Sequence, residues 1–401
     1  MKILMLSWEY PPRIVGGLSR HVYWLSRSIA ELGHRVIVGT LSNNANETID
    51  KLYNLTIIRV NPYKIPSPDF ISWVHQFNQT ILERVVELVD PDIDVVHAHD
   101  WLVARASIML KHLYRKPLIA TIHSTEYGRR NGLHNVFERH IHEIEWFLTY
   151  EAWNVIVCSN YMRGEIRRIF ATPSDKIHVI PNGVNPIKKM NRDEVVKVLK
   201  KYNIPLNKKI VLFVGRLVYE KGAHILVEAI PRITRIIDDV FFVFVGTGPM
   251  KEQLVRRSIE LGINHKTAFT GFVSDNDLHA FYNAAYLAVF PSLYEPFGIV
   301  ALEAMSVGKP VIVSNTGGLS EIVEHGKNGL KTPPGDTEAL ADAIIELLLD
   351  PGMAERLGRA GYNMVYEKYT WSRVAEQTLK VYERVLNEYH MGTWKPKFAR
   401  K

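Results

Sequence analysis

The sequence has only one cysteine, Cys158, among its 401 residues. A single cysteine excludes an internal disulfide framework and is typical of a protein in a reducing compartment. Long hydrophobic runs are also missing, because no apolar stretch reaches the ~18 residues that a membrane-spanning helix requires. The apolar stretch within residues 2–9 is too short for the hydrophobic region of a secretory signal peptide, because a charged residue and two prolines follow it at once. These absences predict a cytoplasmic protein.

A nucleic-acid recognition motif is missing as well. The net charge of +7 would suit nucleic acid, an anionic membrane or an anionic small substrate as partner. Since basic clusters without such a motif are most often solvated surfaces, we expect no nucleic-acid partner. A peripheral membrane contact stays open for the first cluster. The basic clusters lie at 163–168, 188–201 and 395–401.

What is present is an ordinary globular composition, 47% hydrophobic and 23% charged, on a chain long enough for two domains of roughly 150–250 residues. Short Val/Ile/Leu-rich segments alternate with amphipathic helical patterns in both halves. This alternation predicts two doubly wound α/β units in tandem, each a parallel sheet covered by helices. Strands are expected at 3–7, 36–40, 55–60, 95–98, 118–122, 155–157, 210–214, 241–245, 268–270, 287–290 and 311–313. Helices are expected at 18–32, 70–89, 103–114, 137–150, 161–170, 224–236, 250–261, 275–284, 299–307 and 337–348.

The boundary between the two units is expected in the polar, basic segment 181–209. A last amphipathic helix begins at Trp371 after plausible capping residues. Periodicity leaves open whether this helix finishes the second unit or returns to the first.

The segment from Glu295 to Glu303 follows an apolar strand and turns through Gly298 into a helix. The free N–H groups and the positive dipole end of such a helix favour an anion such as phosphate. Glu303 lies about 7 Å along the helix axis, at ~1.5 Å per residue. The two carboxylates could therefore contact two parts of one long ligand. A structural interpretation, with one capping and one exposed glutamate, is equally open at this point.

Paired glycines, Gly16 and Gly17, open the first expected helix. They would let an anion approach the backbone, although paired glycines alone are more often a turn. They do not form the spaced three-glycine dinucleotide fingerprint, which disfavours an NAD site.

Polar residues follow several strands, at the edge where open α/β sheets bind ligands. They include His97, His99 and Asp100 after one strand and His123 after the next. We disfavour a metal site because strand residues alternate between faces and no His, Cys or Asp set has metal-ligand spacing.

In the second half, Arg216 and Lys221 follow a strand just before a helix. A guanidinium fork and an ammonium at a strand–helix turn suit a diphosphate. Lys221 could instead pair with Glu220 or face solvent. Gly246 ends the next strand.

The chain resembles retaining glycosyltransferases of the GT-B fold, family four, and is similar to glycogen and starch synthases. The resemblance covers nearly the whole chain and rests on these motifs in order: Gly16-Gly17, Gly215-Arg216, Lys221-Gly222, Gly246-Thr247-Gly248 and Glu295 to Glu303. It implies two Rossmann-like domains facing a cleft, with a C-terminal helix crossing back to the first. Residues 1–185 with 371–401 would bind the acceptor, and residues 186–370 the nucleotide-sugar.

The resemblance also implies roles for individual residues. Arg216 and Lys221 would hold the diphosphate, Glu295 would contact the transferred sugar and Glu303 the ribose hydroxyls. His123 would lie beside the reactive centre of the sugar. Asp100 would lie on the acceptor side, and the Val273 backbone would meet the base. Further donor-side positions are Gly16, Gly17, Gly246, Phe297, Gly298, Ile299 and Val300.

The implied reaction moves a sugar, expected to be glucose, from ADP-glucose, UDP-glucose or another nucleotide-sugar to an α-glucan. No cofactor or metal is expected, because Arg216, Lys221 and the helix N-terminus can stabilise the departing diphosphate. The alternatives are transfer to a lipid, such as phosphatidylinositol or a glycolipid, or to a sugar phosphate. From another class, a nucleotide-sugar epimerase would need no acceptor. A glycosidase is disfavoured because Glu295 and Glu303 bracket a phosphate-binding helix start rather than one sugar bond.

Overall fold

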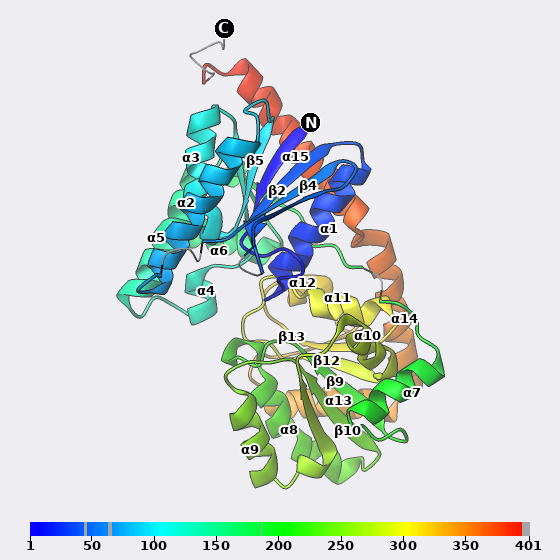
Figure 1. The fold of residues 1–401 in the computed structure, drawn as a ribbon. Helices are drawn as coiled ribbons and strands as arrows, with labels where there is room; N and C mark the ends of the chain where they lie inside the picture. Colours follow the sequence, from blue (N-terminus) through cyan, green and yellow to red (C-terminus); the bar gives the residue numbers. More distant parts are fainter. Residues whose placement is uncertain (44–45, 63–65, 186, 395–401) are drawn as a thin grey trace. The chain divides into compact units, whose positions relative to one another are not determined.

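The chain divides into two compact units (Figure 1). The first comprises residues 1–183 together with the C-terminal segment from Trp371, and the second comprises Val184–Thr370. The structure is a computed structural model, and it describes residues 1–43, 46–62, 66–185 and 187–394.

The first unit contains an eight-stranded sheet of order β3-β4-β2-β1-β5-β6-β7-β8. All neighbouring strands are parallel except β3, which pairs antiparallel with β4 at the edge. The inner strands are apolar and buried, as a parallel sheet covered on both faces requires. The strands are β1 (Lys2–Leu6), β2 (Arg35–Leu41), β3 (Thr48–Lys51), β4 (Leu55–Val60), β5 (Val95–His99), β6 (Leu118–Ile122), β7 (Asn154–Val157) and β8 (Ile177–Val179).

Helices cover this sheet, with α1 against the C-terminal helix α15, and α3 against both α2 and α5 (Figure 1). Several begin at side-chain caps, which satisfy N–H groups that have no partner inside the helix. Asp69, Asn135 and Ser159 cap α2, α5 and α6 in this way. The helices are α1 (Gly17–Glu31), α2 (Phe70–Leu88), α3 (Ala104–Tyr114), α4 (Glu126–Arg130), α5 (Val136–Glu151), α6 (Asn160–Phe170) and α15 (Trp371–Met391).

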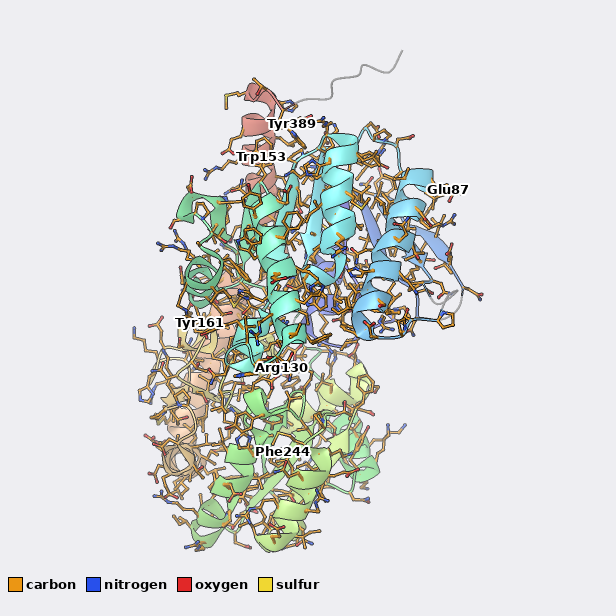
Figure 2. All side chains as sticks on the ribbon, turned by 90° about the vertical axis from the view of Figure 1, so that its left-hand side faces the viewer. Glu87, Arg130, Trp153, Tyr161, Phe244 and Tyr389 are labelled. Atoms are coloured by element: carbon orange, nitrogen blue, oxygen red, sulfur yellow. The ribbon has the colours of Figure 1, made fainter. Side chains whose placement is uncertain are left out.

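The helix α15 belongs to the first unit, although the second unit precedes it in the chain. Its apolar stripe, including Val374 and Val385, is buried. The Trp153 indole N–H donates to Glu388 at 2.9 Å, and Figure 2 shows Trp153 near Tyr389, their ring centroids 6.1 Å apart. This packing settles the choice that periodicity left open. The expected segment continues to residue 401, but residues 395–401, with their basic cluster, lie outside the described part.

We expect Tyr382→Phe to destabilise the first unit by about 1–3 kcal/mol. The Tyr382 hydroxyl lies 2.6 Å from Nδ1 of His97, and Thr121 lies 2.7 Å from its Nε2. Both His97 and Tyr382 are fully buried, so the variant leaves a ring nitrogen unpaired away from water. Thermal unfolding measures the loss, and Tyr53→Phe, at a fully exposed tyrosine, serves as control. Equal melting temperatures for the two variants would contradict the prediction.

The second unit contains a six-stranded, fully parallel sheet of order β11-β10-β9-β12-β13-β14. Its helices pack in groups, with α8 against α9 and α13, α10 against α7, and α11 against α14. The strands are β9 (Lys209–Val214), β10 (Val240–Val245), β11 (Thr267–Gly271), β12 (Leu287–Phe290), β13 (Val311–Ser314) and β14 (Leu330–Thr332). The helices are α7 (Arg192–Lys201), α8 (Ala223–Ile236), α9 (Lys251–Glu260), α10 (Asp275–Ala284), α11 (Ile299–Ser306), α12 (Leu319–Ile322), α13 (Thr337–Leu349) and α14 (Pro351–Lys368).

The predicted class, two Rossmann-like units with parallel sheets, is confirmed, but several elements were missed. The polar segment 181–209 contains α7, which a capping box between Asn191 and Glu194 starts. The strands β3, β8 and β14, of three or four residues each, were also missed, and all three lie at the edge of a sheet. None of the helices in the described part of the chain is long and apolar enough to cross a membrane.

Candidate active site

The second unit gathers the predicted donor-side residues at the carboxyl ends of its strands. Gly215 and Arg216 follow β9, Gly246 follows β10, and the segment from Pro291 to Gly298 follows β12. Because β9 lies between β10 and β12, loops that are far apart in sequence meet at this one edge.

Lys221 forms an ion pair with Glu295, with 2.7 Å between Nζ and Oε2. The alternatives expected from the sequence, Glu220 or solvent, are wrong for Lys221. The turn Tyr219–Lys221 lies against the loop after β12, because the Leu293 N–H donates to the Glu220 carbonyl at 2.8 Å. Backbone contacts therefore position this cation beside this carboxylate.

Gly222 permits that contact between the two loops. Its φ is +70°, and a Cβ there would lie 1.9 Å from the Pro291 carbonyl oxygen. Only glycine allows both this conformation and this approach. The glycine after Lys221 therefore sets the distance between the two strand ends.

Arg216 contacts Glu220, with 3.3 Å between Nη2 and Oε1, and its side chain is half exposed. An exposed pair of this kind contributes little to stability, so the guanidinium can turn to an anionic ligand at small cost. Two cations of the second unit thus stand near the carboxyl end of β9.

Gly298 begins the turn into α11 with a φ of +112°, and no side chain among the described residues caps that helix. The next residues, Ile299 and Val300, form its first turn and are partly exposed, whereas Phe297 is buried. An uncapped first turn leaves N–H groups and the positive dipole end for an anion. The predicted helix start is confirmed.

Glu303 is the fifth residue of α11 and is 5% exposed. Its Oε2 accepts a hydrogen bond of 2.7 Å from the Tyr282 hydroxyl of α10. The interpretation of Glu303 as an exposed surface glutamate is therefore wrong. A buried carboxylate held by a tyrosine is oriented before any ligand arrives.

Gly246 has a structural reason to be glycine. Its φ is +140°, and a Cβ would lie 1.9 Å from the Gly215 carbonyl oxygen. Its N–H donates to the Gly271 carbonyl at 3.0 Å. Gly246 therefore lets the ends of β9, β10 and β11 approach one another. Val273 lies two residues after β11, in the loop that leads to α10, and is buried.

We expect Gly317→Ala to destabilise the second unit by on the order of 3 kcal/mol and to lower turnover. Gly317 has a φ of +53°, and a Cβ would lie 1.9 Å from the carbonyl oxygen of Glu295. The neighbouring Gly318 N–H donates to that same oxygen at 2.9 Å, so the added methyl displaces Glu295 itself. Thermal unfolding and a turnover assay check both effects.

The control is Gly262→Ala, because Gly262 has a φ of +68° but open space around its Cβ position. This variant should cost only about 1 kcal/mol, for the left-handed backbone, and leave turnover unchanged. Equal losses of stability and turnover in both variants would contradict the proposed contact.

In the first unit, one N–H group of the glycine pair Gly16-Gly17 is already engaged within the chain. The N–H groups of Val15 and Gly16 donate to Oε2 of Glu9, at 2.7 and 3.1 Å. Glu9 is buried, and burial raises the pKa of its carboxyl. The Gly16 N–H is therefore engaged by a carboxylate of the chain itself, and Gly17 is the first residue of α1.

His123 follows β6, and Asp100 holds its backbone. The His123 N–H donates to Oδ1 of Asp100 at 2.7 Å. Asp100 has a φ of +60°, and burial raises its carboxyl pKa to about 6. Burial lowers the pKa of the His123 imidazole to about 3, so its ring is neutral near pH 7. Asp100 is thus a positioning residue for His123.

His97 and His99 lie two residues apart on β5 and therefore on the same face, with ring centroids 4.2 Å apart. The prediction that strand alternation places these two histidines on opposite faces is therefore wrong. His97 has both nitrogens engaged, by Tyr382 and Thr121. His99 faces His123 instead, with 3.4 Å between Nδ1 and Nε2.

A cluster of two buried carboxylates, Glu126 and Glu145, with the partly buried Arg129 was not predicted. Both oxygens of Glu145 accept the N–H of Glu126 at 3.0 Å, and Arg129 contacts Glu126 at 2.7 Å and Glu145 at 3.3 Å. Burial raises the pKa of Glu145, and Arg129 opposes that rise. The sequence offered one signal, namely Glu126 three residues after His123 at a strand end.

The chain matches two family models and several known proteins. The model described as Glycosyltransferase Family 4 matches residues 15–188, and the model described as Glycosyl transferases group 1 matches residues 196–364. An uncharacterized glycosyltransferase of Methanocaldococcus jannaschii is 39% identical over 387 residues, 96% of this chain and 98% of that protein. The glycogen synthase of Mycobacterium tuberculosis is 34% identical over 398 residues, 95% of this chain and 94% of that protein.

Among solved structures, the sucrose-phosphate synthase of Thermosynechococcus elongatus is similar with a TM-score of 0.81 and 26% identity. The similarity covers 96% of this chain and 99% of that one. The similarity therefore extends over nearly the full length of this chain and of these proteins. The chain belongs to the family-four glycosyltransferases of the GT-B fold.

Proposed function

We propose that this glycosyltransferase moves glucose from a nucleoside-diphosphate glucose to an α-glucan, with retention of anomeric configuration. The observation that carries the proposal is the Lys221–Glu295 pair of 2.7 Å in the turn that leads into α11. One cation for the diphosphate and one carboxylate for the sugar stand together there. The glycogen synthase relative supports the glucan as acceptor.

The proposed chemistry is stabilisation of the leaving group. The bond between the anomeric carbon and the diphosphate oxygen breaks, and negative charge develops on the diphosphate. Arg216, Lys221 and the first turn of α11 oppose that charge, and because they are preorganised they lower the barrier. The acceptor hydroxyl attacks from the face of the leaving group, and its proton passes to a diphosphate oxygen.

We further propose that Glu303 binds the ribose hydroxyls and that the Val273 backbone meets the base. Glu303 suits this role because Tyr282 already orients its carboxylate. In the first unit, His123 would contact the sugar beside its reactive carbon, and Asp100 would hold that histidine on the acceptor side. The neutral ring of His123 suits a hydrogen bond to a sugar hydroxyl rather than an ion pair.

A donor and acceptor panel tests this function. The chain is incubated with ADP-, UDP- and GDP-glucose, each with and without glycogen or short maltodextrins, and release of nucleoside diphosphate is measured. We expect glycogen-dependent release with at least one donor and an α-anomeric product by NMR. Absence of release with every donor and acceptor, lipids and sugar phosphates included, would overturn the proposal.

The second candidate acceptor is a sugar phosphate. The sucrose-phosphate synthase supports it, since a relative of the same length and fold is named for a sugar-phosphate product. Hexose phosphates form a separate arm of the same panel. Release of nucleoside diphosphate that requires a hexose phosphate and does not depend on glycogen would favour this acceptor.

A third candidate acceptor, a lipid, is proposed because of the basic stretch at 163–168. Arg167 and Arg168 are exposed in the last turn of α6, where cations also complement the helix dipole. Co-sedimentation with anionic liposomes at low salt distinguishes lipid binding by these arginines from a purely local interaction with the dipole of α6.

A nucleotide-sugar epimerase would be indicated instead if the chain rearranged a nucleotide-sugar without any acceptor.

A further inference from the structure

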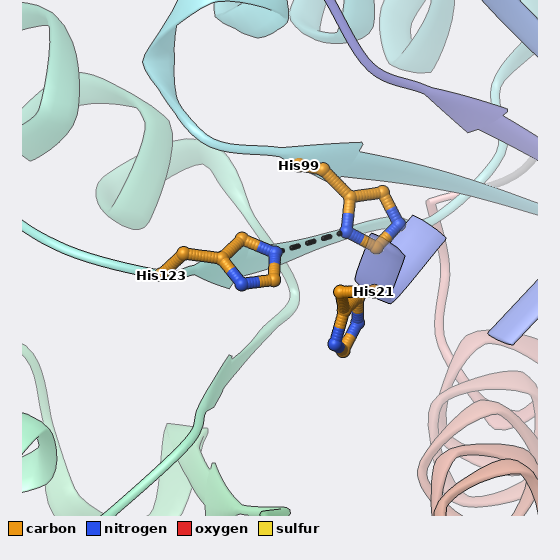
Figure 3. A group of neighbouring side chains, drawn as sticks. All are labelled: His21, His99 and His123. Carbon is orange, nitrogen blue, oxygen red and sulfur yellow. Dashed lines mark hydrogen bonds between the residues drawn. The ribbon is translucent and has the colours of Figure 1, made fainter. Parts of the chain in front are cut away.

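Three histidines from three elements of the first unit converge (Figure 3). His21 lies in α1, His99 ends β5, and His123 follows β6. Each offers one ring nitrogen, and these nitrogens all lie within 4.8 Å of one another. The ring centroids of His21 lie 4.5 Å from His123 and 5.4 Å from His99.

Two of these rings have a buried nitrogen with no hydrogen-bond partner among the described residues. They are Nε2 of His21 and Nε2 of His99, in side chains that are 4% and 0% exposed. A buried polar atom without a partner costs free energy, and such atoms are rare in folded proteins. The cluster therefore contains two ring nitrogens whose hydrogen-bonding capacity is unused among the described residues.

Asn182 orients the first ring. Its Oδ1 lies 2.8 Å from Nδ1 of His21, and because that oxygen can only accept, Nδ1 carries the proton. The lone pair of His21 is then on Nε2, the nitrogen without a partner. Metal-binding histidines typically have this arrangement, with one nitrogen held by an oxygen and the other left for the ion.

The contact between the other two rings has the spacing of a metal site. His99 Nδ1 and His123 Nε2 are 3.4 Å apart, which is long for a hydrogen bond between nitrogens. Two nitrogens that each bind Zn²⁺ at about 2.0–2.1 Å in tetrahedral geometry are separated by about 3.4 Å.

We propose that His21, His99 and His123 form a three-imidazole site for a borderline transition-metal cation such as Zn²⁺. Imidazole ligands select Zn²⁺, Co²⁺, Ni²⁺ or Cu²⁺ over Mg²⁺ and Ca²⁺, which prefer oxygen. Three protein ligands leave a fourth position for water. Since His123 is only partly buried, an ion can enter from its side.

The site has a consequence that rests on the proposed function. There, His123 contacts the sugar of the donor, so an ion held by its nitrogen removes that contact. Zn²⁺ therefore inhibits transfer, and a chelator restores it. The cation is an inhibitor and not a cofactor.

Metal binding is tested first without any assay of activity. The full chain is treated with a chelator, dialysed and titrated with Co²⁺, whose tetrahedral complexes absorb strongly in the visible range, and with Zn²⁺ by calorimetry. We expect one ion per chain. Absence of a tetrahedral cobalt spectrum together with absence of stoichiometric zinc binding would overturn the proposal.

Variants locate the ion. His21→Ala and His99→Ala should weaken binding by more than about 100-fold, and Asn182→Ala by about 10–100-fold, as loss of an outer-shell partner does. His265→Gln, at an exposed histidine of the second unit, should bind like the unchanged chain. Unchanged affinity in folded His21 and His99 variants would contradict the site. If these variants do not fold, X-ray absorption of the zinc-loaded chain still decides, because a first shell without three imidazoles contradicts it.

The two proposals can fail separately. Zinc binding without inhibition would contradict the role of His123 in transfer but leave the metal site standing. Glycogen-dependent turnover in a chain that binds no Zn²⁺ or Co²⁺ would contradict only the metal site.

Discussion

Arg216→Ala and Lys221→Ala should each lower kcat by about 10²–10³-fold while the fold stays intact. Each variant removes a cation that opposes charge on the departing diphosphate, a charge that grows only as the transition state forms. KM for the donor should change less than kcat for the same reason. Steady-state kinetics on the best donor measures the effect, and circular dichroism with thermal unfolding establishes that the fold persists.

The two variants should differ in one respect. Lys221→Ala also leaves Glu295 without its ion-pair partner at a largely buried position, whereas Arg216 is half exposed and pairs only with Glu220 among the contacts described. We therefore expect a lower melting temperature for Lys221→Ala than for Arg216→Ala. Arg216→Lys should recover part of the rate, because the charge returns without the fork.

Matched controls come from the same unit. Arg232→Ala removes an arginine of α8 that pairs with Glu338 and Asp342, and Lys327→Ala removes a lysine that pairs with Glu324. Both should keep full turnover. Near-normal rates in Arg216→Ala and Lys221→Ala would exclude the leaving-group role, whatever donor is used.

Glu303→Ala should raise KM for the donor by about 10–100-fold with kcat within a few-fold of normal. A buried carboxylate that accepts ribose hydroxyls contributes about 1.5–3 kcal/mol per hydrogen bond, equally in the ground state and in the transition state. Calorimetric titration with the nucleoside diphosphate measures the same loss without turnover.

Tyr282→Phe is a milder variant for comparison with Glu303→Ala, since it removes only the hydroxyl that donates to Glu303. Its KM should rise by less than about tenfold, because the carboxylate remains but is less well oriented. Glu324→Ala, at an exposed glutamate, should leave KM unchanged. If Glu303→Ala lowered kcat and left KM unchanged, Glu303 would act in the chemical step and not on the ribose.

The ion pair of Lys221 with Glu295 separates what could be predicted from the sequence from what could not. Both residues could be assigned to strand ends, because each follows an apolar run and precedes a helical pattern. Their contact spans 74 residues and depends on β9 and β12 being neighbours in the sheet. Strand order is decided by the packing of the whole sheet, so no local pattern contains it.

The cluster of His21, His99 and His123 could not be predicted from local sequence either. Metal-ligand motifs are recognised by spacing along the chain, but His21, His99 and His123 come from α1, β5 and the segment after β6. Spacing therefore argued against a metal, and only folding brings the three rings together. The ion pairs of Arg129 with the buried carboxylates Glu126 and Glu145 were missed for a similar reason, since burial of charge depends on the neighbouring helices.

By itself the sequence determined the two α/β units, most of their strands and helices, and the side of each sheet where polar residues gather. Those features follow from periodicity and from chain direction, which are local properties. Only the tertiary structure decided that α15 belongs to the first unit, that Lys221 binds Glu295, and that three histidines share one centre. Such contacts join residues tens to hundreds of positions apart, and their free energy exists only once the intervening chain has folded.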